Sequence, residues 1–234
     1  MCAMSDAYER LAADVAALVG DAGPVVVGVA GGVGVGKSTT AARIQDHLAA
    51  AAVRVEVVGT DAFLLPNDEL ERRDLSMRKG FPETFDTDAL ESFLRAVRAG
   101  APEVRVPVYS HTTYDRVPHM ERVLTPTDVL VVEGVNALQP PVVEHLDVAV
   151  YIEAAEEDMA AWFVDRFLSF CEEARDDEES FYRGFVGMSV AQQRGIAEWT
   201  WREINLVNLR EHIAPSRAAA TVVLSKDRDH AVRS

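Results

Sequence analysis

A glycine-rich segment constrains the fold of this chain more than any other feature. Gly31-Gly-Val-Gly-Val-Gly-Lys-Ser38 contains a glycine, four further residues and then Gly-Lys-Ser. Glycines let the backbone wrap closely, so that successive N–H groups and the start of the next helix converge on an anion. The segment predicts a phosphate site; the alternative is a glycine-rich turn that only joins a strand to a helix. The predicted nucleotide-binding residues here are Gly31, Gly32, Val33, Gly34, Val35, Gly36, Lys37, Ser38 and Thr39.

The flanking pattern predicts an α/β fold. Residues 25–30 form a valine-rich run that suits a strand buried on both faces, and an alanine-rich helix and a second β-branched run (53–58) follow. A strand, a helix and a strand in this order imply parallel pairing. We expect one domain over residues 1–234, with a central, mostly parallel sheet flanked by helices. Further strands are expected at 129–132, 148–152 and 221–224, and helices at 39–52, 86–99, 155–173 and 190–212.

Three other segments have less regular patterns. Residues 5–20 resemble an amphipathic helix whose apolar face includes Leu11 and Leu18. Residues 61–85 are polar and contain prolines, so a loop is expected. Residues 101–126 hold four prolines and several aromatic residues, which favours short extended pieces.

The charge of the chain excludes some functions. The net charge is -15, from 38 acidic and 23 basic residues, which disfavours nucleic acid and anionic membranes as partners. No apolar run approaches the roughly 20 residues that span a bilayer. The two cysteines, Cys2 and Cys171, do not suggest a disulfide, and a cytoplasmic location is expected.

The remaining motifs favour a small-molecule kinase among P-loop proteins. A GTPase would carry Asn-Lys-x-Asp, and the nearest segment, Ser225-Lys-Asp-Arg228, lacks the required acid. A motor ATPase would end its acidic strand with Asp-Glu, whereas this strand ends with Glu133 and a glycine. Glu133 can hold Mg²⁺ through water and the Ser38 hydroxyl can bind it directly, with Lys37 on the phosphates of ATP.

Two charged residues are candidates for the transfer chemistry. Asp61 follows the strand after the phosphate loop, at the sheet edge where ligands bind, and could accept the proton of an acceptor hydroxyl. The alternative is that Asp61 caps a helix or turn. Arg166 could clamp the γ-phosphate from a mobile lid; the alternative is a surface contact with a residue one turn away.

A polar aromatic cluster follows in the proline-rich region. The cluster could recognise a small substrate through Tyr109, His111 and Tyr114. The alternative is the edge of a core whose hydroxyls are satisfied internally.

Several longer segments point to one family. The Lys-Gly-Phe-Pro-Glu and Pro-Val-Tyr-Ser-His segments are more specific than the phosphate loop alone. The segments are Gly34-Val-Gly-Lys-Ser-Thr-Thr40, Thr60-Asp-Ala-Phe-Leu-Leu-Pro-Asn67, Arg78-Lys-Gly-Phe-Pro-Glu-Thr-Phe-Asp86, Pro107-Val-Tyr-Ser-His-Thr-Thr-Tyr-Asp115, Val132-Glu-Gly-Val-Asn-Ala-Leu-Gln139, Trp162–Phe167, Trp201–Leu209 and Ile213–Arg217. With them the chain resembles type I (bacterial) pantothenate kinase, within the uridine kinase and phosphoribulokinase group of P-loop kinases.

The resemblance has consequences for function. It implies a P-loop kinase fold with a helical lid at about residues 155–213, and ATP-dependent phosphorylation of pantothenate, the first step towards coenzyme A. It also implies feedback inhibition by coenzyme A and a homodimer. Asp61 is then the base and Arg166 the phosphate clamp, and His230 would lie against the adenine. The pantothenate pocket is implied to include Tyr109, His111, Tyr114, Phe163 and Asn205.

The chain departs from the family pattern near the acceptor. Ala62 replaces a glycine, Phe163 replaces a tyrosine that contacts the substrate, and an arginine that bears on coenzyme A binding is displaced to Arg43. The connection 139–147 is short, and the family's extra N-terminal helices are not matched. Two alternatives stay open: a kinase of another hydroxyl compound, such as a nucleoside or sugar, and a non-catalytic nucleotide-binding regulator.

Overall fold

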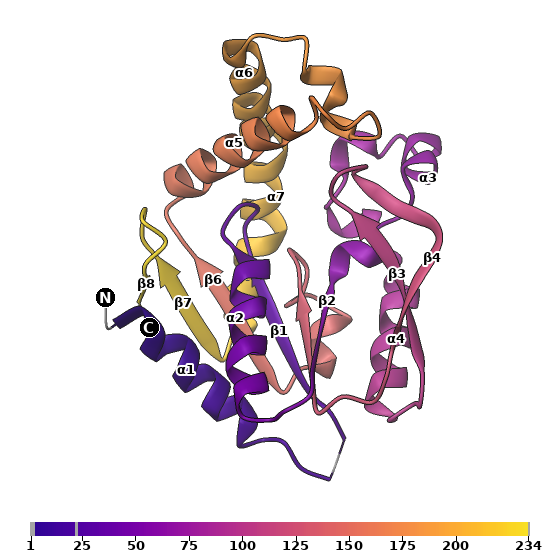
Figure 1. Ribbon diagram of the computed structural model, residues 1–234, viewed down its shortest axis with the longest axis vertical. Helices are drawn as coiled ribbons and strands as arrows, with labels where there is room; N and C mark the ends of the chain where they lie inside the picture. Colours follow the sequence, from indigo (N-terminus) through magenta and orange to yellow (C-terminus); the bar gives the residue numbers. More distant parts are fainter. Residues whose placement is uncertain (1–2, 22, 234) are drawn as a thin grey trace.

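A six-stranded sheet forms the centre of the computed structural model, which describes residues 3–21 and 23–233. The strand order is β2-β5-β1-β6-β7-β8, and every neighbouring pair is parallel except β7 and β8. Helices flank this sheet, which confirms the predicted α/β fold (Figure 1). The strands are β1 (Val25–Gly31), β2 (Val55–Gly59), β5 (Val129–Glu133), β6 (Val148–Glu153), β7 (Val222–Lys226) and β8 (Val232–Arg233).

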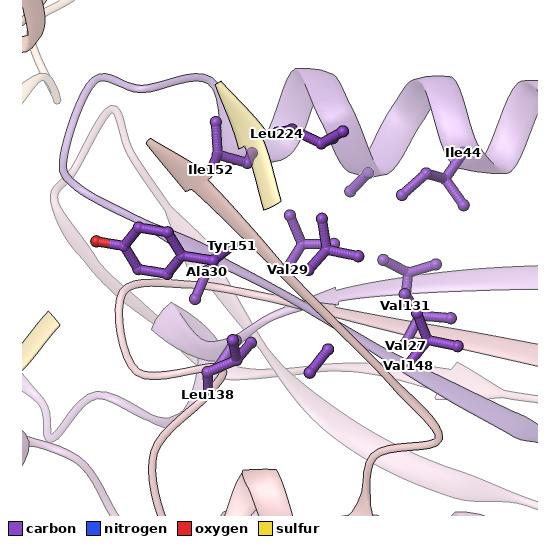
Figure 2. Packing of buried hydrophobic residues seen from close by; sticks show 14 of the residues in the cluster. Val27, Val29, Ala30, Ile44, Val131, Leu138, Val148, Tyr151, Ile152 and Leu224 are labelled. Atoms are coloured by element: carbon purple, nitrogen blue, oxygen red, sulfur yellow. The ribbon is translucent and has the colours of Figure 1, made fainter. Parts of the chain in front are cut away.

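The central strands are buried on both faces because alternate residues enter two different cores. Val27 of β1 and Val131 of β5 belong to one core, while Val26 and Leu130 belong to the other. Figure 2 shows the first core, in which Val27 and Val131 lie together. A strand buried in this way needs a continuous apolar run, which explains why the sequence predicted these strands well.

Helices cover the two faces of the sheet. Helix α2 (Lys37–Ala50) packs on the first core through Ile44, and α1 (Ala3–Ala16) packs on α2. On the other face, α4 (Thr87–Arg98) contributes Phe93 to the second core. This layering leaves the C-terminal edge of the parallel strands open to a ligand, because the helices cover the faces rather than the strand ends.

A separate antiparallel hairpin corrects the prediction for residues 101–126. Strands β3 (Val104–Ser110) and β4 (Asp115–Leu124) pair along most of their length, with a shift of register between Pro107 and Tyr109. We expected only short extended pieces because of the prolines. In a two-stranded sheet, however, every strand is an edge, and a proline there need not leave a partner unpaired.

Two helices joined by an irregular turn form the upper part of the molecule in Figure 1. Helix α5 (Glu156–Glu173) is followed by α6 (Val190–Thr200). The helical backbone predicted for 190–212 continues beyond α6 as two π-helical turns on either side of the short α7 (Leu206–Asn208). The π turns are Trp201–Asn205 and Leu209–Ile213.

The N-terminal helix is shorter than predicted. We expected it to continue to residue 20, but α1 ends at Ala16, and Leu18 is 53% exposed instead of lying on the apolar face. Gly20 and Gly23 then pair in an isolated bridge, and this tight reversal is incompatible with a continuing helix.

The segment 61–85 is more ordered than the predicted loop. It contains α3 (Asn67–Arg72), whose Leu70 is fully buried. A helix this short offers too few residues for a recognisable period, so the sequence pattern did not reveal it. Single 3₁₀ turns occur at Thr60–Phe63, Ser76–Arg78, Pro82–Thr84, Val142–His145, Phe181–Phe185 and Ala214–Ala219.

Two predictions drawn from composition concern cysteine and membranes. Cys171 is a buried free thiol, and Cys2 lies outside the described residues. Among the described helices, none is long and apolar enough to cross a membrane.

Candidate active site

The phosphate loop joins β1 directly to α2, as its sequence predicted. Gly36 has φ 88°, a left-handed conformation that favours glycine, and α2 begins at the next residue. Lys37 donates from Nζ to the carbonyl of Gly32 over 3.0 Å, which folds its side chain back along the loop. Burial lowers the pKa of Lys37, whereas the carboxylates of Glu133 and Asp61 raise it. The loop therefore has the strand, turn and helix that a phosphate site requires.

The lid helix lies directly against this loop. A Cβ atom at Gly34, where φ is 80°, would come within 3.3 Å of the backbone nitrogen of Phe163 in α5. At Gly32 an added Cβ would meet the Met159 sulfur at 2.7 Å. These approaches place α5 over the phosphate loop and explain two of the loop glycines by close packing as well as by phosphate binding.

Ser38 and Glu133 meet beside the phosphate loop. The Ser38 hydroxyl donates to Oε1 of Glu133 over 2.8 Å, and Glu133 ends β5 next to Gly59 of β2. Burial raises the pKa of Glu133, while Lys37 and the hydrogen bond from Ser38 lower it. Within the described residues, no group of three or more His, Cys, Asp or Glu side chains could hold a metal. One hydroxyl and one carboxylate fit Mg²⁺, which usually keeps several waters and binds substrate phosphates.

Asp61 lies at the centre of the site. It belongs to the 3₁₀ turn that follows β2, and that turn has no side-chain capping hydrogen bond, which disfavours the capping role. No hydrogen bond or ion pair of its carboxylate is found among the described residues. Yet its charge raises the pKa of groups from several segments, which places it between the phosphate loop and the hairpin. The groups it affects are Lys37, Lys79, Tyr109, Tyr114 and Glu133.

Arg166 extends from the outer part of α5. Its guanidinium lies 5.1 Å from the ring centroid of Phe170, one helical turn away, and its side chain is exposed. Its charge lowers the pKa of Lys37, Tyr114 and Tyr182, so it lies within electrostatic range of the site. The structure thus shows the one-turn surface contact, and the phosphate clamp stays a prediction.

The tip of the β3–β4 hairpin supplies the aromatic cluster. Tyr109 lies edge-on to His111 at 5.3 Å and to Tyr114 at 6.5 Å. Tyr114 has φ 53°, an unusual conformation for a residue with a side chain, and the hairpin turn holds it there. Burial raises the pKa of both tyrosines, so both phenols stay neutral. The charge of His111 lowers the Glu133 pKa, which places the cluster within electrostatic range of the Ser38–Glu133 pair.

Lys79 completes this cluster and was missed as a site residue. Its Nζ donates to Asn67 Oδ1 and to the Tyr114 carbonyl, both at 2.6 Å, and lies 4.4 Å from the Tyr114 ring centroid. Burial lowers the pKa of Lys79 to about 8, although Asp115 and Asp61 raise it. The sequence contained a signal for Lys79, because this residue belongs to the Lys-Gly-Phe-Pro-Glu segment. Its partners, however, come from α3 and the hairpin, so its surroundings depend on the tertiary fold.

A second group of side chains comes from the lid. Phe163 lies 6.0 Å from Trp201, and Tyr182 is buried between Phe167 and Phe170. Burial raises the pKa of Tyr182 to about 12, and its hydroxyl is close enough to raise the pKa of Tyr109 and Tyr114. Tyr182, which was not predicted as a site residue, therefore lies near the hairpin and carries a phenol. Phe163, which replaces a tyrosine of the family pattern, carries none.

Asn205 and His230 are the two remaining residues that the resemblance implied for the site. Asn205 is the last residue of the first π turn. Its Nδ2 is buried with no hydrogen-bond partner among the described residues, as expected of a group that binds a ligand. His230 stacks on Trp162 of α5, with ring centroids 4.2 Å apart. One face of the imidazole is therefore covered by the indole, and the side chain is otherwise exposed.

These features define a class of protein. A phosphate loop on a parallel sheet, a single carboxylate at the end of β5, a carboxylate after β2 and an arginine on a helix over the loop characterise a P-loop kinase. The model of the phosphoribulokinase / uridine kinase family matches residues 26–167. The chain belongs to this family, as its sequence resemblance implied, and it is an ATP-using phosphotransferase with an alcohol group as acceptor.

Individual relatives support this assignment. The pantothenate kinase of Clavibacter sepedonicus is 43% identical over 96% of this chain and 74% of its own length. That of Leifsonia xyli subsp. xyli is 45% identical over 90% of this chain and 68% of its own. A proposed fructose transport system kinase from Silicibacter sp. TM1040 superposes with a TM-score of 0.75 at 25% identity, covering 92% of this chain and 98% of that structure.

Proposed function

We propose that the acceptor is pantothenate and that it binds beside Asp61, Lys79 and the tip of the β3–β4 hairpin. The observation that carries this proposal is the proximity of the Asp61 carboxylate to the Lys79 cation, beside the half-buried phenols of Tyr109 and Tyr114. Pantothenate has a hydroxyl at one end and a carboxylate at the other, which suits a basic carboxylate and a cation in one pocket. The 41–45% identity to pantothenate kinases supports the same choice.

The residues can divide the reaction among them. Asp61 accepts the proton of the attacking hydroxyl, while Lys37 and Arg166 stabilise the charge on the transferred phosphoryl group. Ser38 and Glu133 hold Mg²⁺, which would neutralise charge on the nucleotide phosphates. Asn205 Nδ2 donates to the acceptor, since it is buried without another partner. Water is excluded by α5, which lies against the loop at Phe163.

An acceptor panel tests the proposal. Turnover of ATP should be compared for pantothenate, uridine, fructose and glycerate, each with and without enzyme. We expect pantothenate to have a kcat/KM at least 100-fold above every other acceptor, because a site that pairs buried polar groups with one substrate strongly rejects others. A preference for a nucleoside or sugar, which Phe163 and Ala62 would then explain, overturns the choice of acceptor. Absence of turnover with all of them favours a regulator.

Lys79 should give the reaction a specific pH dependence. Its pKa of about 8 lies below the ordinary value for lysine, so its positive charge is present at neutral pH and is lost as the pH rises through about 8. We expect kcat/KM for pantothenate, measured with saturating ATP, to fall tenfold per unit above that pH. The fall reports the lost attraction between the ammonium group and the acceptor carboxylate.

Two substitutions isolate this effect. Lys79→Met should lower kcat/KM for pantothenate about 10- to 100-fold at pH 7, the loss expected when a charge-assisted hydrogen bond is removed. The same substitution should abolish the decrease in kcat/KM above pH 8. Lys79→Arg keeps its charge at every pH and should also give a flat profile, but at higher activity. A high-pH decrease that persists in Lys79→Met would assign the titration to another group.

A further inference from the structure

A buried lysine behind the phosphate loop has no role in the scheme above. Lys226 ends β7 and is only 7% exposed. Its Nζ donates to the carbonyl of Val35 over 2.9 Å and to that of Gly36 over 3.4 Å. No carboxylate within the described part of the chain forms an ion pair with it. A charge buried in this way is costly unless it is compensated.

The surroundings of Lys226 add positive charge instead of negative charge. Burial, followed by the positive charges of Arg43 and Lys37, lowers the pKa of Lys226 to about 8. Arg43 itself lies 5.0 Å from the ring centroid of Tyr8 in α1. The nearby charges therefore add to the cost of the buried cation, and the two carbonyls compensate Lys226 only in part. Such a site is suited to an anion that arrives with the ligand.

The two hydrogen bonds also orient the loop. In a trans peptide, the C=O and the next N–H point in opposite directions. Lys226 donates to the carbonyls of Val35 and Gly36, and the Gly36 carbonyl also accepts from the Thr40 N–H over 3.0 Å, so the N–H groups of Gly36 and Lys37 face away from the lysine. Gly36 is adapted to this contact, since a Cβ there would lie 2.6 Å from Lys226 Nζ. The lysine therefore acts on the peptide groups that a phosphate would meet.

We propose that Lys226 is a positioning residue of the nucleotide site: it holds the peptide groups after Val35 and Gly36 towards the polyphosphate, whose charge compensates its buried cation. This inference rests on ATP as the donor and is independent of the acceptor. Lys226 belongs to the Ser225-Lys-Asp-Arg228 segment, which carries no sequence motif for this role.

Nucleotide affinity tests the proposal, because the effect should depend on the phosphates. Calorimetric titration with ATP, ADP and adenosine, each in the presence of Mg²⁺ and without acceptor, should be compared for the wild type and Lys226→Met. In Lys226→Met, we expect the affinity for ATP and ADP to fall about 10- to 100-fold, because a charge-assisted interaction is lost. The affinity for adenosine should change by less than about threefold. A general packing defect would weaken all three ligands alike.

Further variants keep the test decisive if Lys226→Met fails to fold. Lys226→Arg retains the charge and donors and should recover most of the ATP affinity. Lys226→Gln retains a donor without charge and should lie between arginine and methionine. Arg54→Met, on the exposed Arg54–Asp128 pair far from the loop, is the matched control and should bind like the wild type. Equal ATP affinity in Lys226→Gln and the wild type, or equal losses for ATP and adenosine, would overturn the proposal.

The same experiment separates this inference from the proposed function. If the wild type binds no ATP, the assignment of the donor fails. If the wild type binds ATP and Lys226 variants bind it equally well, only the role of Lys226 fails. In turnover, Lys226→Gln should raise the KM for ATP and leave that for pantothenate within about twofold, a split that a structural defect would not produce. Lys226→Arg should stay close to the wild type in both values.

Discussion

Asp61→Asn is expected to lower kcat with pantothenate by about 1,000-fold, within the range for loss of a general base. Asparagine has the shape of aspartate but cannot accept the proton of the attacking hydroxyl at neutral pH. Because Asp61 forms no hydrogen bond or ion pair among the described residues, its replacement leaves no partner unsatisfied. Steady-state kcat and the dissociation constant of ATP should both be measured, and ATP binding should be retained within about threefold.

The control for this substitution is Asp88→Asn. Asp88 is exposed in the first turn of α4 and forms no part of the site, so its change should leave kcat unaltered. A kcat for Asp61→Asn within a few-fold of the wild type would mean that another group accepts the proton. Loss of turnover with ATP binding intact would instead exclude the non-catalytic regulator, since a regulator has no turnover to lose.

The second large effect is expected at Arg166. Replacement by methionine should lower kcat by about 1,000-fold, at the lower end of the contribution of an arginine that stabilises a transferred phosphoryl group. Methionine can keep the packing on Phe170, where the guanidinium now lies 5.1 Å from the ring centroid, so the loss reports charge and geometry. The KM for ATP should change by less than about fivefold, because the interaction forms mainly in the transition state.

A conservative and a remote variant complete this test. Arg166→Lys keeps the charge but loses the planar pair of donors, and we expect it to recover only part of the activity. Arg194→Met removes an exposed arginine of α6 that lies 4.0 Å from Asp165 and should be neutral. Equal losses in kcat for the Arg166 and Arg194 variants would show a general disturbance of the lid instead of a catalytic contact.

The parts of the fold and of the site that could be predicted from the sequence are those that depend on short contiguous segments. The phosphate loop is a contiguous segment whose backbone performs the binding, so its motif and flanking pattern were sufficient. Strands such as β1 and β5 are buried on both faces, and their apolar runs are unmistakable. Asp61 and Glu133 could be placed at one sheet edge because the carboxyl ends of parallel strands meet there.

The residues that the sequence did not reveal depend on tertiary contacts. Lys79 is one of several basic residues in a polar segment, and only the packing of α3 and the hairpin encloses it. Tyr182 lies in an acidic, irregular turn between α5 and α6 that has no periodic pattern. Lys226 appears in sequence as an ordinary charged residue at a strand end. A buried cation cannot be distinguished from a solvated one until its surroundings are known.

The hydrogen bond from Lys226 to Val35 also has a consequence during synthesis of the protein, because it joins residues 191 positions apart. The strand that supports the loop from behind is translated 191 residues after it. At about 5–20 residues per second, the interval is about 10–40 s. During that interval the nascent chain has the complete phosphate-loop sequence but lacks the lysine behind it. We expect a ribosome-bound chain that stops before β7 to bind ATP weakly, so nucleotide binding would report the synthesis of β7.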